Sequence, residues 1–263
     1  MRRSLGIAVA VSVLAFGVAS CGAAEERVVV AAGTTLVDSG ILDDLVSAYE
    51  RARPEARISV VGDATARVLA LGRSETASVL ITHSPESEER FLEEAGAARY
   101  ELLMMSHFLL LGPAEAVTSL AGMSAAEAFA AIAGQRFVAR ADGSGTSEAE
   151  AAIWSAAGID PSAETWYSTT GLGMAETLQV AETRGAFVLA EAGAYLEASG
   201  VLSLVPAALA PGPLLDNPYH LILTVGAPQE ATALVEWLLS PEGRDALHRA
   251  QRERFGEVVY QAP

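Results

Sequence analysis

The sequence predicts an α/β protein of two lobes, each a mostly parallel sheet flanked by helices, with a ligand cleft between the lobes. Short apolar runs alternate with amphipathic helical segments, which is the pattern of parallel sheets. Gly-Pro at 112–113 and Asn-Pro at 217–218 interrupt this alternation, and such pairs mark turns. A chain of 263 residues is long enough for two domains of ordinary size.

The first third of the chain carries the clearest alternation. Its predicted strands are continuous apolar runs, as expected where both faces of a sheet are buried. These strands are 28–32, 58–61 and 78–82, and the helical segments are 41–52, 67–73 and 86–96. Small polar turns at 33–35 and 62–66 separate a strand from the next helix.

The remaining chain repeats the pattern around a middle segment. The predicted strands are 99–111, 137–139, 186–189 and 220–225, with 201–205 extended and 206–213 irregular. The predicted helices are 124–133, one that follows the turn at 140–146 and runs to 154, 172–185, 191–199, 230–239 and one that starts at 240–243. We therefore expect lobe one to comprise 21–112 and 218–263, and lobe two to be the inserted segment 113–217. Ligands of such folds bind at the carboxyl ends of strands and between lobes.

Composition excludes one class of partner. The chain is 51% hydrophobic and 19% charged, which is typical of a globular protein. Its formal net charge is −16, from 33 acidic and 17 basic residues, and every basic residue is arginine. Nucleic-acid binding requires basic clusters, so we expect no nucleic-acid partner.

The N-terminus has the features of an export signal. Arg2 and Arg3 precede an apolar run from Leu5 to Val18, which is too short for a stable transmembrane helix. Small residues then precede Cys21, the only cysteine of the chain, and this arrangement resembles the lipobox of bacterial lipoproteins. The resemblance implies removal of residues 1–20, lipidation of Cys21, and an anchor to the cell envelope on its periplasmic or outer face. The alternative is an ordinary secretory signal with an incidental cysteine.

Residues 137–154 suggest an anion site. A short strand leads through a glycine-rich turn into a helix, whose first N–H groups lack intrahelical partners and carry partial positive charge. The turn supplies Arg140, Ser144, Gly145 and Thr146, which offer a guanidinium, two hydroxyls and close backbone approach. The alternative is a capped helix with no ligand. We expect Asp142 to pair with Arg140 or to form the turn, because a carboxylate repels a bound dianion.

An ordered series of segments along nearly the whole mature chain carries a family resemblance. The segments are DSGIL at 38–42, LGR at 71–73, SVLITHSPESEERF at 78–91, FLLLGP at 108–113, RADGSGT at 140–146, WYSTTGLGMAETL at 166–178, NPYHLILTV at 217–225 and EWLLSPEGR at 236–244. In this order they resemble the tungstate-binding (TupA-like) branch of the periplasmic solute-binding proteins that serve ABC oxyanion importers. The chain is a divergent member: Ala32, Gly33, Thr34 and Thr35 replace the TTTS loop of the family, and Ala64-Thr65-Ala66 replaces its GTG turn.

The resemblance implies a type II periplasmic-binding-protein fold and a function. Thr34, Thr35 and Thr65 of lobe one would face Arg140, Ser144, Gly145 and Thr146 of lobe two across the cleft. The expected ligand is tungstate or molybdate, with no cofactor and no metal ion. The expected partners are an ABC permease and its ATPase, with the chain acting as a monomer. Because a deprotonated tetrahedral dianion only accepts hydrogen bonds, such a site should present donors.

Three alternatives stay open at this point. The RADGSGT turn also resembles that of phosphate-binding proteins, and phosphate would gain from an acceptor carboxylate if Asp63 pointed into the cleft. A non-transport sensor lipoprotein with a degenerate site is the second. An enzyme is disfavoured because His83, His107, His220 and His248 are scattered without HExxH spacing, and no G-x-S-x-G elbow occurs.

Glu148 and Glu150 are interpreted as surface acids that stabilise the helix dipole, with Ser147 and Glu150 as a capping box.

Overall fold

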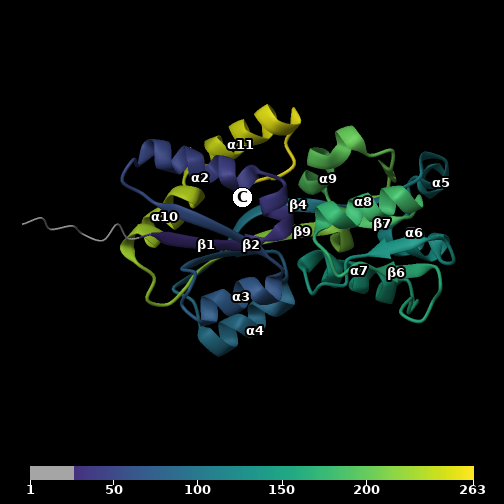
Figure 1. Cartoon of the computed structure of the whole chain (residues 1–263), viewed down its shortest axis with the longest axis horizontal. Coiled ribbons are helices and arrows are strands. Elements are labelled where there is room, and N and C mark those ends of the chain that lie inside the picture. The colour runs from purple at the N-terminus through teal and green to yellow at the C-terminus, as the bar shows by residue number, and fades with distance from the viewer. Residues whose placement is uncertain (1–26) are drawn as a thin grey trace, which may run out of the picture.

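The computed structural model describes residues 27–263 (Figure 1). The predicted signal peptide (1–20) and the lipidation site Cys21 lie outside the described residues. Within the described part, none of the helices has the length and apolarity needed to span a membrane.

A five-stranded portion of sheet forms the centre of lobe one. Its order is β2-β1-β3-β9-β4, with bounds Ile58–Asp63, Val28–Gly33, Val79–Thr82, Asp216–Leu223 and Arg99–Gly112. β1 pairs in parallel with both β2 and β3, whereas β9 runs antiparallel to β3 and β4. β1 and β3 are thus central strands, which explains their uninterrupted apolar sequence, whereas β2 lies at the edge of the sheet and is partly exposed.

Helices cover both faces of this portion of the sheet. One face carries α2 (Ile41–Ala52), α10 (Gln229–Leu239) and α11 (Pro241–Phe255), and the other carries α3 (Thr65–Arg73) and α4 (Pro85–Ala95) (Figure 1). A large buried cluster lies under the first group, and a smaller one that includes Phe91 lies under the second. Lobe one is therefore a three-layer arrangement with the sheet buried between helices.

Lobe two is built on the second half of β4. Phe108 to Leu111 pair with β7 (Val188–Glu191), and β8 (Val205–Pro206) pairs with the end of β4. β5 (Phe137–Ala139) pairs in parallel with β6 (Tyr167–Thr169). The helices are α5 (Ala114–Val117), α6 (Ala125–Ile132), α7 (Gly145–Ala156), α8 (Met174–Arg184) and α9 (Ala192–Ala198), with short 3-10 turns η1 (Thr118–Leu120), η2 (Ser199–Val201) and η3 (Pro213–Leu215). Two further apolar clusters fill this lobe.

The predicted two-lobe α/β class is confirmed, although the sheet is mixed and not mostly parallel, because β4 and β9 run antiparallel to their neighbours. β4 also shows how the lobes are joined. This 14-residue strand pairs with β9 up to His107 and with β7 from Phe108 onward, so one sheet runs through both lobes. The sheet changes partner inside a strand and not at the predicted Gly112-Pro113. The lobe limits at 112 and 218 stay a prediction.

A buried carboxylate lies where the sheet changes partners. Glu191, at the end of β7, accepts hydrogen bonds from the Ser106 hydroxyl at 2.5 Å and from the Tyr260 hydroxyl at 3.1 Å. The C-terminal segment pairs with β4 through Met105 and Gln261. Burial raises the pKa of the Glu191 carboxyl. The C-terminal residues therefore hold the crossing between the two lobes together.

Two of the differences from the sequence prediction arise from contacts with distant residues. The predicted turn at 33–35 is instead the start of a short helix, α1 (Thr34–Asp38). β9 begins at Asp216, before the predicted 220, because its first residues pair with Ser106 and His107 of β4. In both cases pairing or packing against distant residues decides the local structure.

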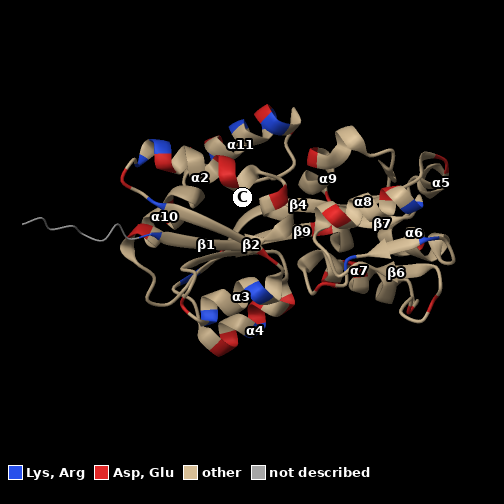
Figure 2. Ribbon diagram, viewed as in Figure 1, with Lys and Arg blue, Asp and Glu red and all other residues tan. Residues whose placement is uncertain are grey.

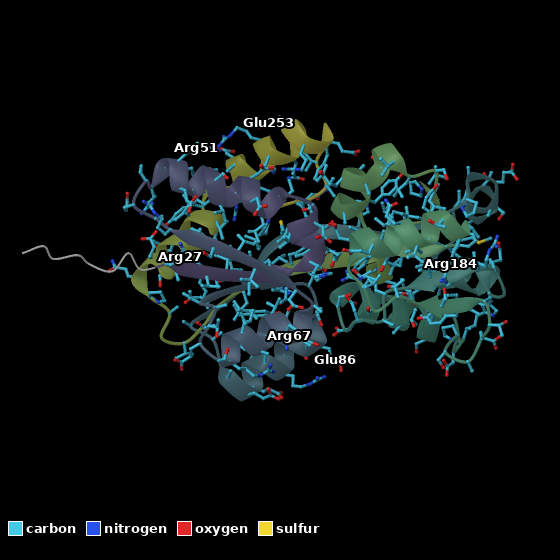
Figure 3. All side chains as sticks on the ribbon, viewed as in Figure 1. Arg27, Arg51, Arg67, Glu86, Arg184 and Glu253 are labelled. Carbon is cyan, nitrogen blue, oxygen red and sulfur yellow. The ribbon has the colours of Figure 1, made fainter. Side chains whose placement is uncertain are left out.

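Charged residues lie mainly on the helices and loops of both lobes (Figure 2). Among the labelled side chains, Arg51, Arg67 and Glu253 lie on helices of lobe one, and Arg184 lies on lobe two (Figure 3). A buried arginine is therefore a notable exception in this molecule, and Arg140 is such a residue, with 1% of its surface exposed.

Candidate functional site

Lobe one contributes two adjacent helix starts. Gly33 and Asp63 are register partners at the ends of the parallel strands β1 and β2, so the helices that begin at Thr34 and Thr65 start side by side. In the described part of the chain, neither helix has a side-chain N-cap. Helix starts without caps present N–H donors and partial positive charge outward.

Lobe two contributes the turn between β5 and α7. Ala141 has a φ of 51° and Gly143 one of 72°, both in the left-handed region, which folds the chain back on itself. Ser144 is the N-cap of α7, with its Oγ accepting a hydrogen bond from the Ser147 N–H. The predicted capping box of Ser147 with Glu150 is therefore wrong, because the helix begins three residues earlier than that box requires.

Asp142 organises this turn. Its Oδ1 accepts hydrogen bonds from the hydroxyls of Ser144 at 2.6 Å and Ser147 at 2.8 Å, and its Oδ2 accepts one from Arg140 Nη2 at 2.5 Å. Burial opposes ionisation, yet the Ser144 hydrogen bond and the Arg140 charge hold the pKa of Asp142 below its ordinary value. As expected, Asp142 is a partner of Arg140, and its oxygens are occupied within the turn.

Arg140 joins the two lobes. Its Nη2 donates to Thr34 Oγ1 at 2.9 Å as well as to Asp142, whereas Nε and Nη1 are buried without a hydrogen-bond partner among residues 27–263. Nε carries one N–H and Nη1 two, so three guanidinium donors are unused. An unpaired buried donor costs roughly 1–3 kcal/mol, and more when it is charged, so an acceptor is expected beside it.

Two threonine hydroxyls resemble the unused Arg140 donors. The hydroxyls of Thr65, at the start of α3, and Thr146, in the first turn of α7, are buried without a partner among the described residues. Thr65 comes from lobe one, whereas Thr146 and Arg140 come from lobe two. The unpartnered donors thus come from both lobes, as a ligand enclosed between two lobes requires.

His83 lies between the two lobes and was not predicted as a site residue. Its ring stacks on Tyr219 at 4.8 Å between centroids. A Cβ on Gly145 of lobe two would lie 2.4 Å from the His83 carbonyl oxygen. Burial, together with the charge of Arg140, lowers the pKa of His83 to about 4, so the ring is neutral at pH 7. Glycine at 145 therefore lets α7 approach lobe one closely.

A second contact between lobes involves Glu148. This residue of α7 was interpreted as a dipole-stabilising surface acid, and it does lie in the first turn. Its carboxylate also accepts hydrogen bonds from the hydroxyls of Ser84 and, at 2.8 Å, Ser87 of lobe one. Glu148 therefore connects α7 of lobe two to the start of α4 of lobe one by two hydrogen bonds.

Replacing Glu148 with alanine is expected to weaken the binding of any cleft ligand roughly fivefold, because about one net hydrogen bond of closed-state stabilisation is lost. Ligand preference should not change, since Glu148 contacts lobe one and not the unpartnered donors. Calorimetric titration of the variant measures this. The charge-matched control is Glu164→Ala, which removes an exposed acid of the same lobe. Equal losses of affinity in the two variants would contradict this role of Glu148.

Glu150 is not a surface acid. It is 3% exposed, and its Oε1 accepts hydrogen bonds from the Trp154 indole at 3.2 Å and the Tyr167 hydroxyl at 2.7 Å. Burial raises the pKa of Glu150 to about 7. The sequence interpretation was wrong because the aromatic cluster around Trp154 brings the helix face with Glu150 into the core.

Glu150→Gln is expected to change the pH dependence of stability. The folded protein binds the Glu150 proton more tightly than the unfolded chain, so this group stabilises below pH 4.5 and loses that contribution as pH rises through 7. Glutamine keeps the acceptor oxygen without ionising. From pH 4.5 to 8 the wild type should therefore lose on the order of 3 kcal/mol relative to the variant. Denaturant unfolding at several pH values tests this, and a constant difference would contradict it.

The geometry of Asp63 bears on the chemistry of the ligand. Its Oδ1 accepts the Ala64 N–H at 2.8 Å, its Oδ2 lies 3.7 Å from Arg67 Nε, and the side chain is 42% exposed. Asp63 is thus engaged by its own backbone and by an exposed arginine. Among residues 27–263, no group of three or more His, Cys, Asp or Glu side chains is arranged to hold a metal ion.

The predicted site residues fall into four groups in the structure. Thr34 and Arg140 are in direct contact, and Thr65 and Thr146 have buried free hydroxyls. Ser144 and Gly145 shape the start of α7. Thr35 is buried, and its hydroxyl is engaged by His83 and Tyr219. Binding by these residues remains a prediction.

Comparison with known proteins places this arrangement in a family. The model of the PBP superfamily domain matches residues 20–242. The chain belongs to the PBP superfamily. This PBP-superfamily protein is 34% identical to a Haloferax volcanii protein provisionally described as an ABC transporter anion-binding protein, over 84% of this chain and 68% of the other.

Two further relatives narrow the comparison. The tungstate-binding protein TupA of Peptoclostridium acidaminophilum is 29% identical over 99% of this chain and 98% of its own length. A crystal structure of the tungstate ABC transporter from Geobacter sulfurreducens superposes with a TM-score of 0.75 at 28% identity, covering 85% of this chain and 98% of that one. The chain is therefore a TupA-like solute-binding protein of the PBP superfamily, and its relatives are binding proteins rather than enzymes.

Proposed function

We propose that this protein captures a tetrahedral oxyanion of the tungstate type between its lobes and delivers it to an ABC importer. The proposal is carried by four buried donor atoms from both lobes that have no partner among residues 27–263: Arg140 Nε and Nη1, Thr65 Oγ1 and Thr146 Oγ1. Donors alone suit a dianion that only accepts hydrogen bonds. The tungstate-binding relatives support this assignment.

The proposed ligand is tungstate, with molybdate as a ligand of the same geometry and charge. Phosphate is the weaker candidate, because at neutral pH it often carries a proton that needs an acceptor. Asp63 is held by Ala64 and Arg67, and the Asp142 oxygens are used within the turn. No acceptor carboxylate is thereby offered by these two residues, which favours an unprotonated dianion.

The proposed cellular setting follows from the same family. A protein of this kind would act outside the cytoplasmic membrane, anchored by a lipid on Cys21 after removal of residues 1–20, and would meet an ABC permease with its ATPase as a monomer. Mass spectrometry of the membrane-extracted protein tests the anchor: a diacylglyceryl mass on an N-terminal Cys21 supports it, and a soluble mature chain that begins elsewhere contradicts it.

Calorimetric titration of the purified protein with tungstate, molybdate, sulfate and phosphate tests the ligand. We expect micromolar or tighter binding of tungstate and molybdate at neutral pH, with weaker binding of sulfate and phosphate. Phosphate binding that exceeds tungstate binding would overturn the ligand class. A lack of heat and of any melting shift with all four ions would point to a sensor with a degenerate site.

A further inference from the structure

We propose that Thr35 supports the anion site structurally and does not donate a hydrogen bond to the anion. His83 is the positioning residue that fixes this role, because its ring accepts the hydrogen bond of the Thr35 hydroxyl. The inference rests on the proposed anion function and divides the site threonines into two kinds. Thr34, Thr65 and Thr146 would donate to the anion, whereas Thr35 would hold the start of α1 in place.

The inference begins with a buried chain of polar groups. His83 Nδ1 lies 2.7 Å from Asn217 Oδ1, and His83 Nε2 lies 3.2 Å from Thr35 Oγ1. Tyr219 places its hydroxyl 3.1 Å from the same Thr35 oxygen. All four residues are buried, with His83 4% exposed and the others 0%. Solvent therefore does not compete for these hydrogen bonds.

The direction of each bond follows from the donor inventory. Asn217 presents its carbonyl oxygen to His83, and because a carbonyl oxygen only accepts, this orientation of the amide assigns the hydrogen to His83 Nδ1. The Asn217 Nδ2 is buried without a partner among residues 27–263. A neutral imidazole has one N–H, which leaves His83 Nε2 as an acceptor. The hydrogen that it accepts is that of the Thr35 hydroxyl. The Thr35 oxygen then accepts from the Tyr219 hydroxyl.

The ring must be neutral for this arrangement. The charged groups that act on it are Arg140, Glu88 and Asp142, and its hydrogen-bond partner on β9 is the uncharged Asn217. Burial and the Arg140 charge disfavour the imidazolium and outweigh the Asn217 hydrogen bond and the two carboxylates, which lowers the pKa of His83 to about 4. At neutral pH the ring therefore has one donor and one acceptor.

Thr34 is in the opposite situation, although it is the adjacent residue. Its oxygen accepts from Arg140 Nη2 at 2.9 Å, so its own hydroxyl hydrogen is free to donate elsewhere. Thr65 and Thr146 have free buried hydroxyls. These three threonines and Arg140 therefore have hydrogens available for an anion, whereas the Thr35 hydrogen is already used in the hydrogen bond to His83.

The position of the His83 ring explains why Thr35 needs structural support at the start of α1. A Cβ on Gly33 would lie 3.3 Å from His83 Cδ2, and one on Gly145 would lie 2.8 Å from His83 Nδ1. The imidazole thus fills the space between the strand end of lobe one and the helix start of lobe two. By holding Thr35, it sets where Thr34 meets Arg140.

The experiment combines a spectroscopic and a binding measurement on the purified protein. Nitrogen-15 NMR of labelled histidine at pH 7 reports which ring nitrogen of His83 carries the hydrogen, with His83→Gln used to assign the signal. We expect the hydrogen on Nδ1. Tungstate titration of Thr34→Val and Thr65→Val should show at least a tenfold loss of affinity, and Thr35→Val less than a threefold loss with a lowered melting temperature.

Two results would overturn the inference. One is a hydrogen on His83 Nε2, because Thr35 would then be free to donate. The other is a loss of affinity in Thr35→Val as large as that in Thr34→Val. If the wild type binds none of the oxyanions, the proposed function fails, while the NMR measurement still decides the hydrogen position. Thr35→Ser, which keeps the hydroxyl, should restore the melting temperature.

Discussion

Replacing Arg140 with alanine is expected to lower oxyanion affinity by about two to three orders of magnitude. The substitution removes a buried positive charge and three unpartnered N–H donors, and charge-assisted bonds are the strong ones. It also removes the 2.9 Å contact with Thr34 that joins the lobes. Calorimetric titration with tungstate measures the loss.

Two further variants separate charge, geometry and folding. Arg140→Lys keeps the charge without the planar set of donors, so it should recover only part of the affinity. Arg136→Ala removes an exposed arginine from the residue before β5 and should bind like the wild type. Asp142 keeps its serine partners in the Arg140 variants, so these should fold. Unchanged affinity in folded Arg140→Ala would contradict the assigned role.

Gly145→Ala is expected to reduce affinity by at least about a hundredfold while the empty protein stays folded. A Cβ at this position would lie 2.4 Å from the backbone oxygen of His83, and backbone cannot move away as a side-chain tip can. Within lobe two the residue begins α7, where alanine favours a helix more than glycine does. The clash therefore acts on closure of the lobes and not on folding.

The control for this prediction is Gly200→Ala, because a Cβ there would meet no heavy atom within 4 Å. Small-angle scattering with and without tungstate reports closure directly. The wild type and Gly200→Ala should become more compact with ligand, whereas Gly145→Ala should stay open. A Gly145→Ala protein that closes and binds normally would show that the close approach to His83 is not required.

Local sequence patterns were sufficient for most of the fold. The strands of lobe one could be predicted because strands buried on both faces read as unbroken apolar runs, as 28–32 and 78–82 do. The short helix α1 could not, because five residues are too few for a periodic signal and its position depends on packing at the end of β1. The change of partner within β4 was equally hidden, because a single strand looks the same whichever strand it pairs with.

For the proposed site, the sequence predicts the donor residues but not the contacts among them. Arg140, Thr65 and Thr146 could be predicted as donors because guanidinium and hydroxyl groups near helix starts are visible in the sequence. His83 was missed because an isolated histidine after an apolar run carries no motif, and its partners Asn217 and Tyr219 lie more than a hundred residues away. Glu150 was misjudged because the tertiary contacts with Trp154 and Tyr167 decide its burial.

A crystal structure of the protein grown with tungstate tests the central claim most directly, because tungsten scatters anomalously and locates itself without bias. The account predicts one strong anomalous peak between the lobes, with tungstate oxygens within hydrogen-bond distance of Arg140 Nε and Nη1 and of the Thr65 and Thr146 hydroxyls. A peak elsewhere, or a bound tungstate that leaves those four groups without a partner, would contradict it.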